Sequence, residues 1–273
     1  MTRLTIPPDL QHVLGDAWNQ TRSVPGYLLE NEAKFLGLLA ACAPAKGLIV
    51  EIGSFKGRST VMLAKVASHY RLGPVVAIDP HNSPTLLDHQ SESGSSSYPE
   101  FLQSLQKAGV FAHVESHRAY SQDLAATWTR PIRVLWIDGD HSYEGAKKDL
   151  EGFLPHLVPY GVVAFHDVLH PHPGPIRVFV EEVLRSNQFG AAGFVHSIAW
   201  AQFRPEDGAA FQRQRASLER AASRLIPFVQ DGNELHGLRK GLYKLNRFRV
   251  PHSAITPNDW GSLLEASSKH SQS

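Results

Sequence analysis

Short apolar runs rich in β-branched residues alternate with segments whose apolar positions recur every three or four residues. The runs predict strands, and the recurring positions predict amphipathic helices. Strands that alternate with helices are typical of a parallel sheet covered on both faces, so we expect a doubly wound α/β fold. The predicted strands are 47–53, 74–80, 111–116, 132–138 and 161–167, and the main predicted helices are 57–70, 142–155 and 175–186.

Three segments fall outside this alternation. Residues 1–45 hold a helical segment and are predicted to form an N-terminal cap over the sheet edge or the site. The serine-rich segment 82–100 has no period and is predicted to be a mobile loop, and a lid is one role for it. The extension 205–273 is helical and basic, with a disordered end predicted over 262–273. The central domain therefore spans residues 46–204.

Composition and charge narrow the class of protein. The chain has 273 residues, 42% of them hydrophobic, and a net charge of +1. Because no global field favours nucleic acid or a membrane surface, we expect small-molecule partners and neither of those two. The single cysteine, Cys42, excludes an internal disulfide and favours a reducing compartment. No apolar segment has the length of a signal peptide or of a membrane helix, so we expect a cytoplasmic protein.

The basic stretch GLRKGLYKLNRFR, 237–249, follows Leu235 and carries Leu238, Leu242 and Leu245 at helical spacing. It could attract a phosphate-bearing ligand or a neighbouring subunit, which would make a homo-oligomer. Two glycines weaken it as an isolated helix, so we favour a packed terminal helix with a solvated basic face.

The turn after the first predicted strand reads VEIGSFKGRST and contains Glu51, Gly53, Gly57 and Ser59. Glycine lets backbone amides approach a ligand, and the following helix presents unpaired N–H groups. A dinucleotide site is expected to show G-x-G-x-x-G, which is absent. An acid here would repel a pyrophosphate but suits the ammonium and sulfonium of S-adenosylmethionine. A tight turn without a ligand is the structural alternative.

Two further features of this region fit a nucleoside. Asp79 closes the second predicted strand, at the distance where an acid usually meets ribose hydroxyls; a turn residue before Pro80 is the alternative. Ser54 adds a loop amide, and Phe55 could shield the cofactor or face solvent. Together they predict a cofactor site at the end of the first two strands.

Acids and imidazoles end the fourth and fifth predicted strands. The segment WIDGDHSYEGAKKDL places Asp138 at a strand end, with Asp140 and His141 just after it. The segment LVPYGVVAFHDV ends in His166 and Asp167. Such polar endings on buried strands indicate chemistry at this edge of the sheet.

The ordered set of these segments, with VVAIDPH, resembles the class I S-adenosylmethionine-dependent methyltransferases. Within them it is similar to the small-molecule O-methyltransferases that include the macrocin and novobiocin sugar methyltransferases. The resemblance covers roughly residues 25–200. It implies a seven-stranded Rossmann-like sheet of order 3-2-1-4-5-7-6, with the seventh strand antiparallel and 194–204 near that edge. It also places Ser121 where related enzymes contact the adenine; a helix N-cap is the alternative.

In that sheet order, Asp138 and Asp167 face each other across the site. Two converging carboxylates repel, so one takes a proton or a cation lies between them. The resemblance implies a divalent metal bound by Asp138, His166 and Asp167, and Mg²⁺ suits oxygen ligands best. His166 stands where relatives often have an acid, and its imidazole shifts preference toward Mn²⁺, Zn²⁺ or Fe²⁺. The alternative is that Asp138 contacts the methionine part of the cofactor without any metal.

Asp140 and His141 are the candidate catalytic bases. Asp140 occupies the position that the sugar-methylating relatives use, although it also suits a helix cap, and His141 has the pKa better suited to neutral pH. The sequence thus predicts a metal-assisted O-methyltransferase acting on a hydroxylated small molecule, such as a sugar or a nucleotide-linked sugar. The alternatives are a nicotinamide-dependent oxidoreductase and a cofactor-binding module without turnover.

Overall fold

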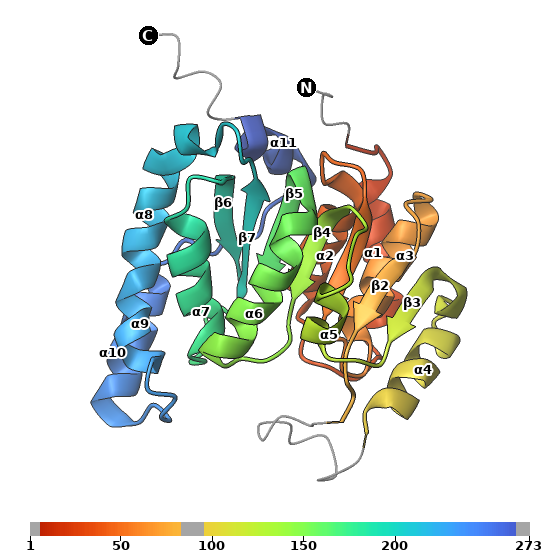
Figure 1. Cartoon of the computed structure of the whole chain (residues 1–273), viewed down its shortest axis with the longest axis horizontal. Helices are drawn as coiled ribbons and strands as arrows, with labels where there is room; N and C mark the ends of the chain where they lie inside the picture. Colours follow the sequence, from red (N-terminus) through yellow and green to blue (C-terminus); the bar gives the residue numbers. More distant parts are fainter. Residues whose placement is uncertain (1–5, 83–95, 266–273) are drawn as a thin grey trace.

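A seven-stranded sheet runs through the computed structural model, which describes residues 6–82 and 96–265 (Figure 1). Its order is β3-β2-β1-β4-β5-β7-β6, and β7 pairs antiparallel with both of its neighbours. The predicted fold class and sheet order are confirmed. The strands are β1 Leu48–Ile52, β2 Val75–Ile78, β3 Val114–His117, β4 Ile132–Ile137, β5 Leu157–Phe165, β6 Phe189–Val195 and β7 Ile198–Phe203.

Helices cover both faces of the sheet, because successive strand residues point to opposite faces. Along β1, Ile49 packs with one apolar cluster and Val50 with the other. Helices α1 to α4 and α11 contribute to the first cluster, and α6 to α10 to the second. The helices are α1 Leu10–Thr21, α2 Glu30–Cys42, α3 Arg58–His69, α4 Tyr98–Lys107, α5 Ser121–Ala125, α6 Tyr143–Phe153, α7 Gly174–Val178, α8 Gln212–Ala222, α9 Ile226–Val229, α10 Gly237–Phe248 and α11 Pro257–Glu265.

Most predicted elements of the central domain are observed with shifted ends. The third strand begins late, because a 3-10 turn occupies residues 111–113. The fifth strand begins early, at Leu157, and the predicted helix at 175–186 is α7 continued by a π-helical turn, Phe179–Leu184. Strand β6 begins at Phe189, before the predicted edge segment.

The N-terminal segment contains two helices rather than one. The predicted helical segment is α2, whereas α1 was not predicted, although its buried Leu10, Val13, Leu14 and Ala17 follow helical spacing. Of the predicted loop 82–100, residues 83–95 lie outside the described residues. Its end is helical, because α4 begins at Tyr98 and Pro99 is tolerated in a first helical turn.

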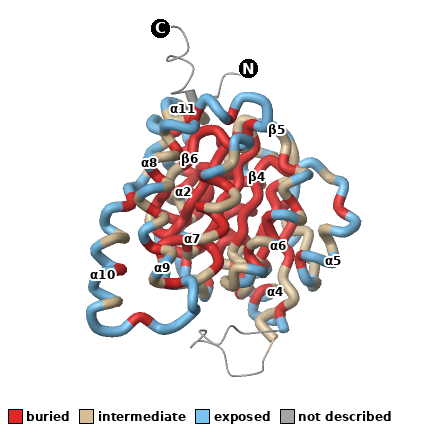
Figure 2. The backbone as a smooth tube through the Cα atoms, turned by 60° about the vertical axis from the view of Figure 1, so that its left-hand side comes forward, coloured by how far each residue is buried: buried red, intermediate tan, exposed pale blue. Residues whose placement is uncertain are grey.

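The C-terminal extension departs most from expectation. Leu235 is buried, but Leu238, Leu242 and Leu245 of α10 are 79%, 42% and 51% exposed, so their predicted packing is wrong. Helix α10 instead buries Tyr243, whose hydroxyl donates to the Leu169 carbonyl, and Figure 2 shows most of α10 exposed. Predicted disorder is wrong over 262–265, which belong to α11, while 266–273 lie outside the described residues. None of the described helices is both long and apolar enough to span a bilayer.

Candidate active site

A cleft of about 840 Å³ lies at the carboxyl ends of β1, β4 and β5. Open parallel sheets bind ligands at this edge, and the volume lies within the range of small-molecule sites. Residues Pro25–Leu28 of the N-terminal segment border it as well. The predicted site residues that line it are Gly53, Ser54, Phe55, Ser59, Asp79, Ser121, Asp138, Asp140, His141, His166 and Asp167.

The turn after β1 crosses the end of β4 at close range. Gly53 has a φ of +86°, and a Cβ there would collide with the Asp138 carbonyl, so only glycine fits. Its N–H donates to the Ile78 carbonyl (2.9 Å), and the Asp138 N–H donates to the Ile52 carbonyl (2.8 Å). The turn therefore places Asp138 beside the cofactor loop.

Asp79 holds this loop in shape. Its Oδ2 accepts from the Phe55 N–H (2.8 Å) and its Oδ1 accepts from the His81 N–H (2.7 Å). Both donors belong to residues with positive φ, +45° and +52°. A carboxylate oxygen has two lone pairs, so Asp79 can still accept hydrogen bonds from a ligand in the cleft.

Glu51 and Gly57 do not line the cleft, which corrects the expectation that they contact the cofactor. The Glu51 carboxylate is fully buried and accepts from the Thr60 hydroxyl of α3, and its Oε1 has no hydrogen-bond partner in the part of the chain that the structure describes. Burial raises the pKa of Glu51 to about 7. Gly57, the N-cap of α3, has a φ of +93° and lies against Phe101. Both residues support the turn from the side that faces away from the cleft.

Asp138 and Asp167 converge on the ring of His166. Its Nδ1 lies 3.2 Å from Asp138 Oδ1 and 3.5 Å from Asp167 Oδ1. Its Nε2 lies 3.5 Å from Oε2 of the buried Glu32. One ligand atom from each of Asp138, His166 and Asp167 lies within 4.8 Å of the others, so this nitrogen and two carboxylates suit a divalent metal.

The charges of this cluster depend on one another. Burial opposes protonation of His166, but Asp138 and Asp167 outweigh it and raise the pKa of His166 well above its ordinary value. Burial would raise the pKa of Asp167, yet the charges of His166, His170 and His141 hold it well below its usual range. Burial would also raise the pKa of Glu32, but its contacts with His166 lower that pKa to about 2. A proton on His166 would balance the charge of the converging acids, and a metal bound at Nδ1 would take the place of that proton.

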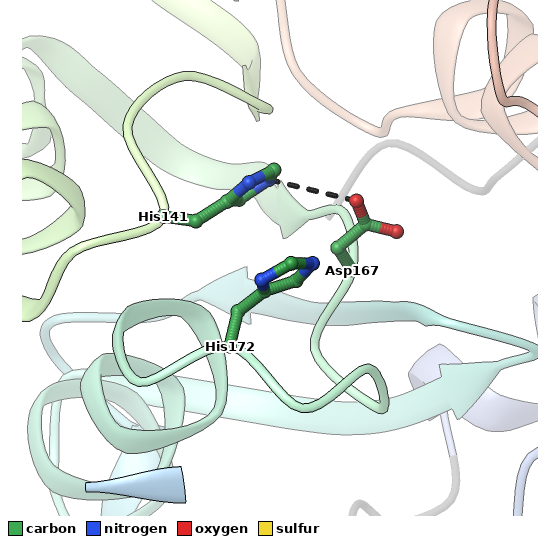
Figure 3. A group of neighbouring side chains, drawn as sticks. All are labelled: His141, Asp167 and His172. Carbon is green, nitrogen blue, oxygen red and sulfur yellow. Dashed lines mark ion pairs between the residues drawn. The ribbon is translucent and has the colours of Figure 1, made fainter. Parts of the chain in front are cut away.

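His141 lies on the other side of Asp167. Its Nε2 is 3.5 Å from Asp167 Oδ2 and 3.8 Å from Asp138 Oδ1 (Figure 3). Burial opposes protonation, but the two acids raise the pKa of His141. Its ring stacks on that of His172, with centroids 4.4 Å apart, and burial lowers the pKa of His172 to about 4. His141 therefore interacts with the same two aspartates as His166.

Asp140 is engaged at the start of α6. Its Oδ1 accepts from the Ser142 N–H (2.8 Å), and its Oδ2 accepts from the Ser142 hydroxyl (2.9 Å). The Ser142 hydroxyl in turn accepts from the Gly145 N–H as the N-cap. The cap alternative for this loop is therefore observed, while Asp140 remains exposed at the cleft wall.

A family described as a methyltransferase domain matches residues 50–168. Residues 50–168 are therefore similar to a methyltransferase domain, and they lie in a sheet of the order that the resemblance implied. This match agrees with the resemblance seen in the sequence.

Solved structures of other proteins share the fold of this chain. Cofactor-bound Rv0187 from MTB has 20% identity over 74% of this chain and 99% of that chain, with a TM-score of 0.52. The O-methyltransferase NovP has 12% identity over 69% and 88%, with a TM-score of 0.53. The methyltransferase PaMTH1 of Podospora anserina, solved with S-adenosylhomocysteine, has 16% identity over 74% and 89%, with a TM-score of 0.50.

Sequence reasoning missed two buried acids in or next to the cleft. Asp149 of α6 lines the cleft, accepts from the Ser121 hydroxyl, and has its pKa raised to about 6 by burial. Its signal was an acid beside Leu150 on the apolar face of a predicted helix. Glu32 was missed because an acid in the first turn of a helix is usually explained as a capping residue. It does accept from the Leu29 N–H, in addition to its contact with His166.

The N-terminal wall of the cleft was also missed. Arg58, the first residue of α3, donates from Nε to the Val24 carbonyl (2.6 Å) and from Nη1 to the Leu28 carbonyl (3.1 Å). These bonds hold residues 25–28 against the cleft, where the Tyr27 ring stacks on Phe55. No local pattern connects residues that lie 30 or more positions apart.

Proposed function

We propose that this protein transfers the methyl group of S-adenosylmethionine to a hydroxyl oxygen of a small molecule, assisted by a divalent metal. One observation carries the proposal. The glycine turn with Asp79 and the cluster of Asp138, His166 and Asp167 line a single cleft. A nucleoside cofactor and a hydroxylated acceptor would therefore meet in one place, as direct group transfer requires.

Residues near β1 and β2 form the cofactor half of the cleft. Gly53, Ser54, Phe55 and Ser59 line it beside the start of α3, and Asp79 would accept the ribose hydroxyls. Ser121 lines the cleft beyond β3, on the side proposed for the adenine. Asp138 lies between the two halves, where it could serve either the methionine part or the metal.

Asp138, His166 and Asp167 would hold the metal. When bound, a divalent ion such as Mg²⁺ supplies a Lewis acid that lowers the pKa of an adjacent acceptor hydroxyl. Glu32 behind His166 fits this role, because a metal-binding histidine usually has a carboxylate at its other nitrogen.

The transfer itself needs alignment and one base. The acceptor oxygen attacks the methyl carbon in line, the carbon–sulfur bond breaks, and S-adenosylhomocysteine leaves with the electron pair on sulfur. The hydroxyl proton passes to Asp140 or His141, both of which line the cleft. Asp140 already accepts two hydrogen bonds, whereas His141 Nε2 has no hydrogen-bond partner among the described residues.

A sugar or nucleotide-linked sugar is the proposed acceptor class. Lys148 is exposed on the cleft wall and could meet a phosphate of such an acceptor. The N-terminal cap, 1–45, would contribute to acceptor specificity through residues 25–28. We propose that residues 205–273 form an extension outside the cofactor-binding domain. With its buried thiol, Cys42, the protein is proposed to act in the cytoplasm.

The test combines cofactor binding with transfer. Calorimetry should show binding of S-adenosylhomocysteine, and methyl transfer should be detected with a panel of nucleotide-linked sugars. We expect chelation, or Asp167→Asn, to reduce transfer about tenfold or more while S-adenosylhomocysteine still binds. Asp123→Asn, at an exposed acid of α5, is the matched control and should leave transfer unchanged.

Each contrary outcome has a separate meaning. If S-adenosylhomocysteine does not bind, the methyltransferase proposal fails. If chelation leaves transfer intact, only the metal is wrong. Cofactor binding without transfer and without metal affinity would indicate a binding module instead.

A further inference from the structure

We propose that His141, Asp167 and His172 form a second, nitrogen-rich position for a divalent transition metal such as Zn²⁺. It lies beside the position of Asp138, His166 and Asp167 and shares the Asp167 carboxylate with it. The proposal concerns ion binding alone, so it does not depend on methyl transfer.

The three side chains have the spacing that an ion requires. One ligand atom from each lies within 4.8 Å of the others. His141 Nε2 is 3.5 Å from Asp167 Oδ2, which is long for a direct hydrogen bond, and it is buried without a hydrogen-bond partner among the described residues. An ion about 2.1 Å from both atoms would give an angle of roughly 110°, close to tetrahedral.

The rings of His141 and His172 bring their nitrogens to the same side of Asp167. They are nearly parallel, with an interplanar angle of 13° and centroids 4.4 Å apart. Figure 3 shows both rings next to the Asp167 carboxylate, one from the loop after β4 and the other from the loop after β5. A metal would bind an unprotonated nitrogen of each ring, so a ring that carries a proton there would release it on binding.

The two loops are held together before any ion arrives. The Gly174 N–H donates to the His141 carbonyl (2.9 Å), and a Cβ at Gly174 would collide with the Ser142 carbonyl. The His172 N–H donates to the His170 carbonyl (2.8 Å) within the same loop. Glycine at 174 therefore permits the close approach that places His172 against His141, and a preformed set of ligands favours binding.

Asp167 is oriented independently of the two histidines. Its φ is +54°, an unfavourable conformation for a residue other than glycine, and His170 Nδ1 lies 2.8 Å from its Oδ1. This contact leaves Oδ2 facing His141. A neighbouring group that orients a ligating carboxylate is typical of metal sites.

The donor set selects the metal. Two imidazoles and one carboxylate suit Zn²⁺, Co²⁺ or Fe²⁺, whereas Mg²⁺ requires oxygen ligands. Three protein ligands would leave a position for water or an acceptor oxygen. An ion on His141 Nε2 would also occupy the lone pair needed to accept a proton, so the role of base would pass to Asp140.

Cobalt binding tests the proposal directly. The wild-type chain is titrated with Co²⁺ in the presence of excess Mg²⁺, and binding is followed by calorimetry and by the visible absorption of nitrogen-bound Co²⁺. We expect one ion per chain, and His172→Ala should weaken its binding by roughly tenfold or more. His12→Ala is the matched control, because its side chain is 81% exposed on α1.

A second variant separates the two positions. Asp138→Asn removes a ligand of the acid-rich position only, so Co²⁺ binding should persist in it. The proposal is overturned if wild type binds no Co²⁺, if His172→Ala binds it as tightly as wild type, or if Asp138→Asn alone abolishes binding. Circular dichroism and S-adenosylhomocysteine affinity report separately on folding and on the cofactor site.

Discussion

At the scale of single residues, a buried acid behind the cleft pairs with a residue that is distant in the sequence. Glu32 of α2 is 1% exposed, accepts from the N–H and the hydroxyl of Ser197, and faces His166. Glu32 thus connects α2 and the β6–β7 turn to the end of β5. A buried carboxylate with this many partners is costly to neutralise.

Glu32→Gln is therefore expected to destabilise the fold by about 2–4 kcal/mol near pH 7. Because His166 lowers the folded pKa of Glu32 from 4.5 to about 2, this stabilisation exists above pH 4.5 and is lost as the pH falls toward 2. The difference between Glu32→Gln and wild type should shrink over that interval. Urea unfolding at several pH values measures it.

Glu30→Gln is the control for this prediction. Glu30 lies in the same first turn of α2, but its side chain is 52% exposed and pairs with Lys34 at the surface. Its replacement should change stability little. Equal effects of the two substitutions would show that the buried contacts of Glu32 contribute nothing.

At the scale of elements, the C-terminal helix α11 is part of the core although it follows the exposed α10. Trp260 is fully buried, and its indole N–H donates to the Cys42 carbonyl (3.1 Å). Its ring contacts those of Phe35 and Trp200, with centroids 6.0 and 4.7 Å apart. Helix α11 thus joins α2 and β7 on one face of the sheet.

Trp260→Ala should reduce the free energy of unfolding by about 3–5 kcal/mol, because it removes a large buried ring and leaves the Cys42 carbonyl unpaired. Ser262→Ala, at an exposed position of the same helix, should have almost no effect. Denaturant unfolding of both variants measures the difference. An unchanged midpoint for Trp260→Ala would mean that α11 does not pack on the core in solution.

At the scale of the whole molecule, two buried acids oppose the stability of the fold at neutral pH. Burial raises the pKa of Glu51 to about 7 and that of Asp149 to about 6. Between their ordinary and their folded pKa values, the folded state binds more protons than the unfolded state. Stability should therefore fall as the pH rises from about 4.5 to 7.

Glu51→Gln should remove much of this slope and stabilise the ligand-free protein above pH 7 by on the order of 2 kcal/mol. Chemical unfolding at pH 5, 6, 7 and 8 measures the slope. Glu206→Gln, at an exposed acid, should retain the wild-type slope. An unchanged slope in Glu51→Gln would show that Glu51 is not the group responsible.

The ends of the buried strands were predicted better from the sequence than the helix faces that pack on the core. Strands β1 and β4 and the residues that end them were predicted well, because buried parallel strands are continuous apolar runs bounded by glycine or acids. Helix α10 was predicted as a helix, but the packing of its leucines was wrong, because only the neighbouring elements decide which face of a helix is covered. Glu51 was assigned to the cofactor although the side chain of a strand residue can point away from the cleft.

The sequence by itself determined the alternating elements and the polar residues that end β4 and β5, because hydrophobic period and turn chemistry act over a few neighbouring residues. Its resemblance to known methyltransferases added the sheet order and the cofactor. Only the tertiary structure decided that His166 lies between Glu32 and the two aspartates, and that His172 stacks on His141. Those contacts join residues up to 134 positions apart, where electrostatics and packing act through space and leave no local pattern.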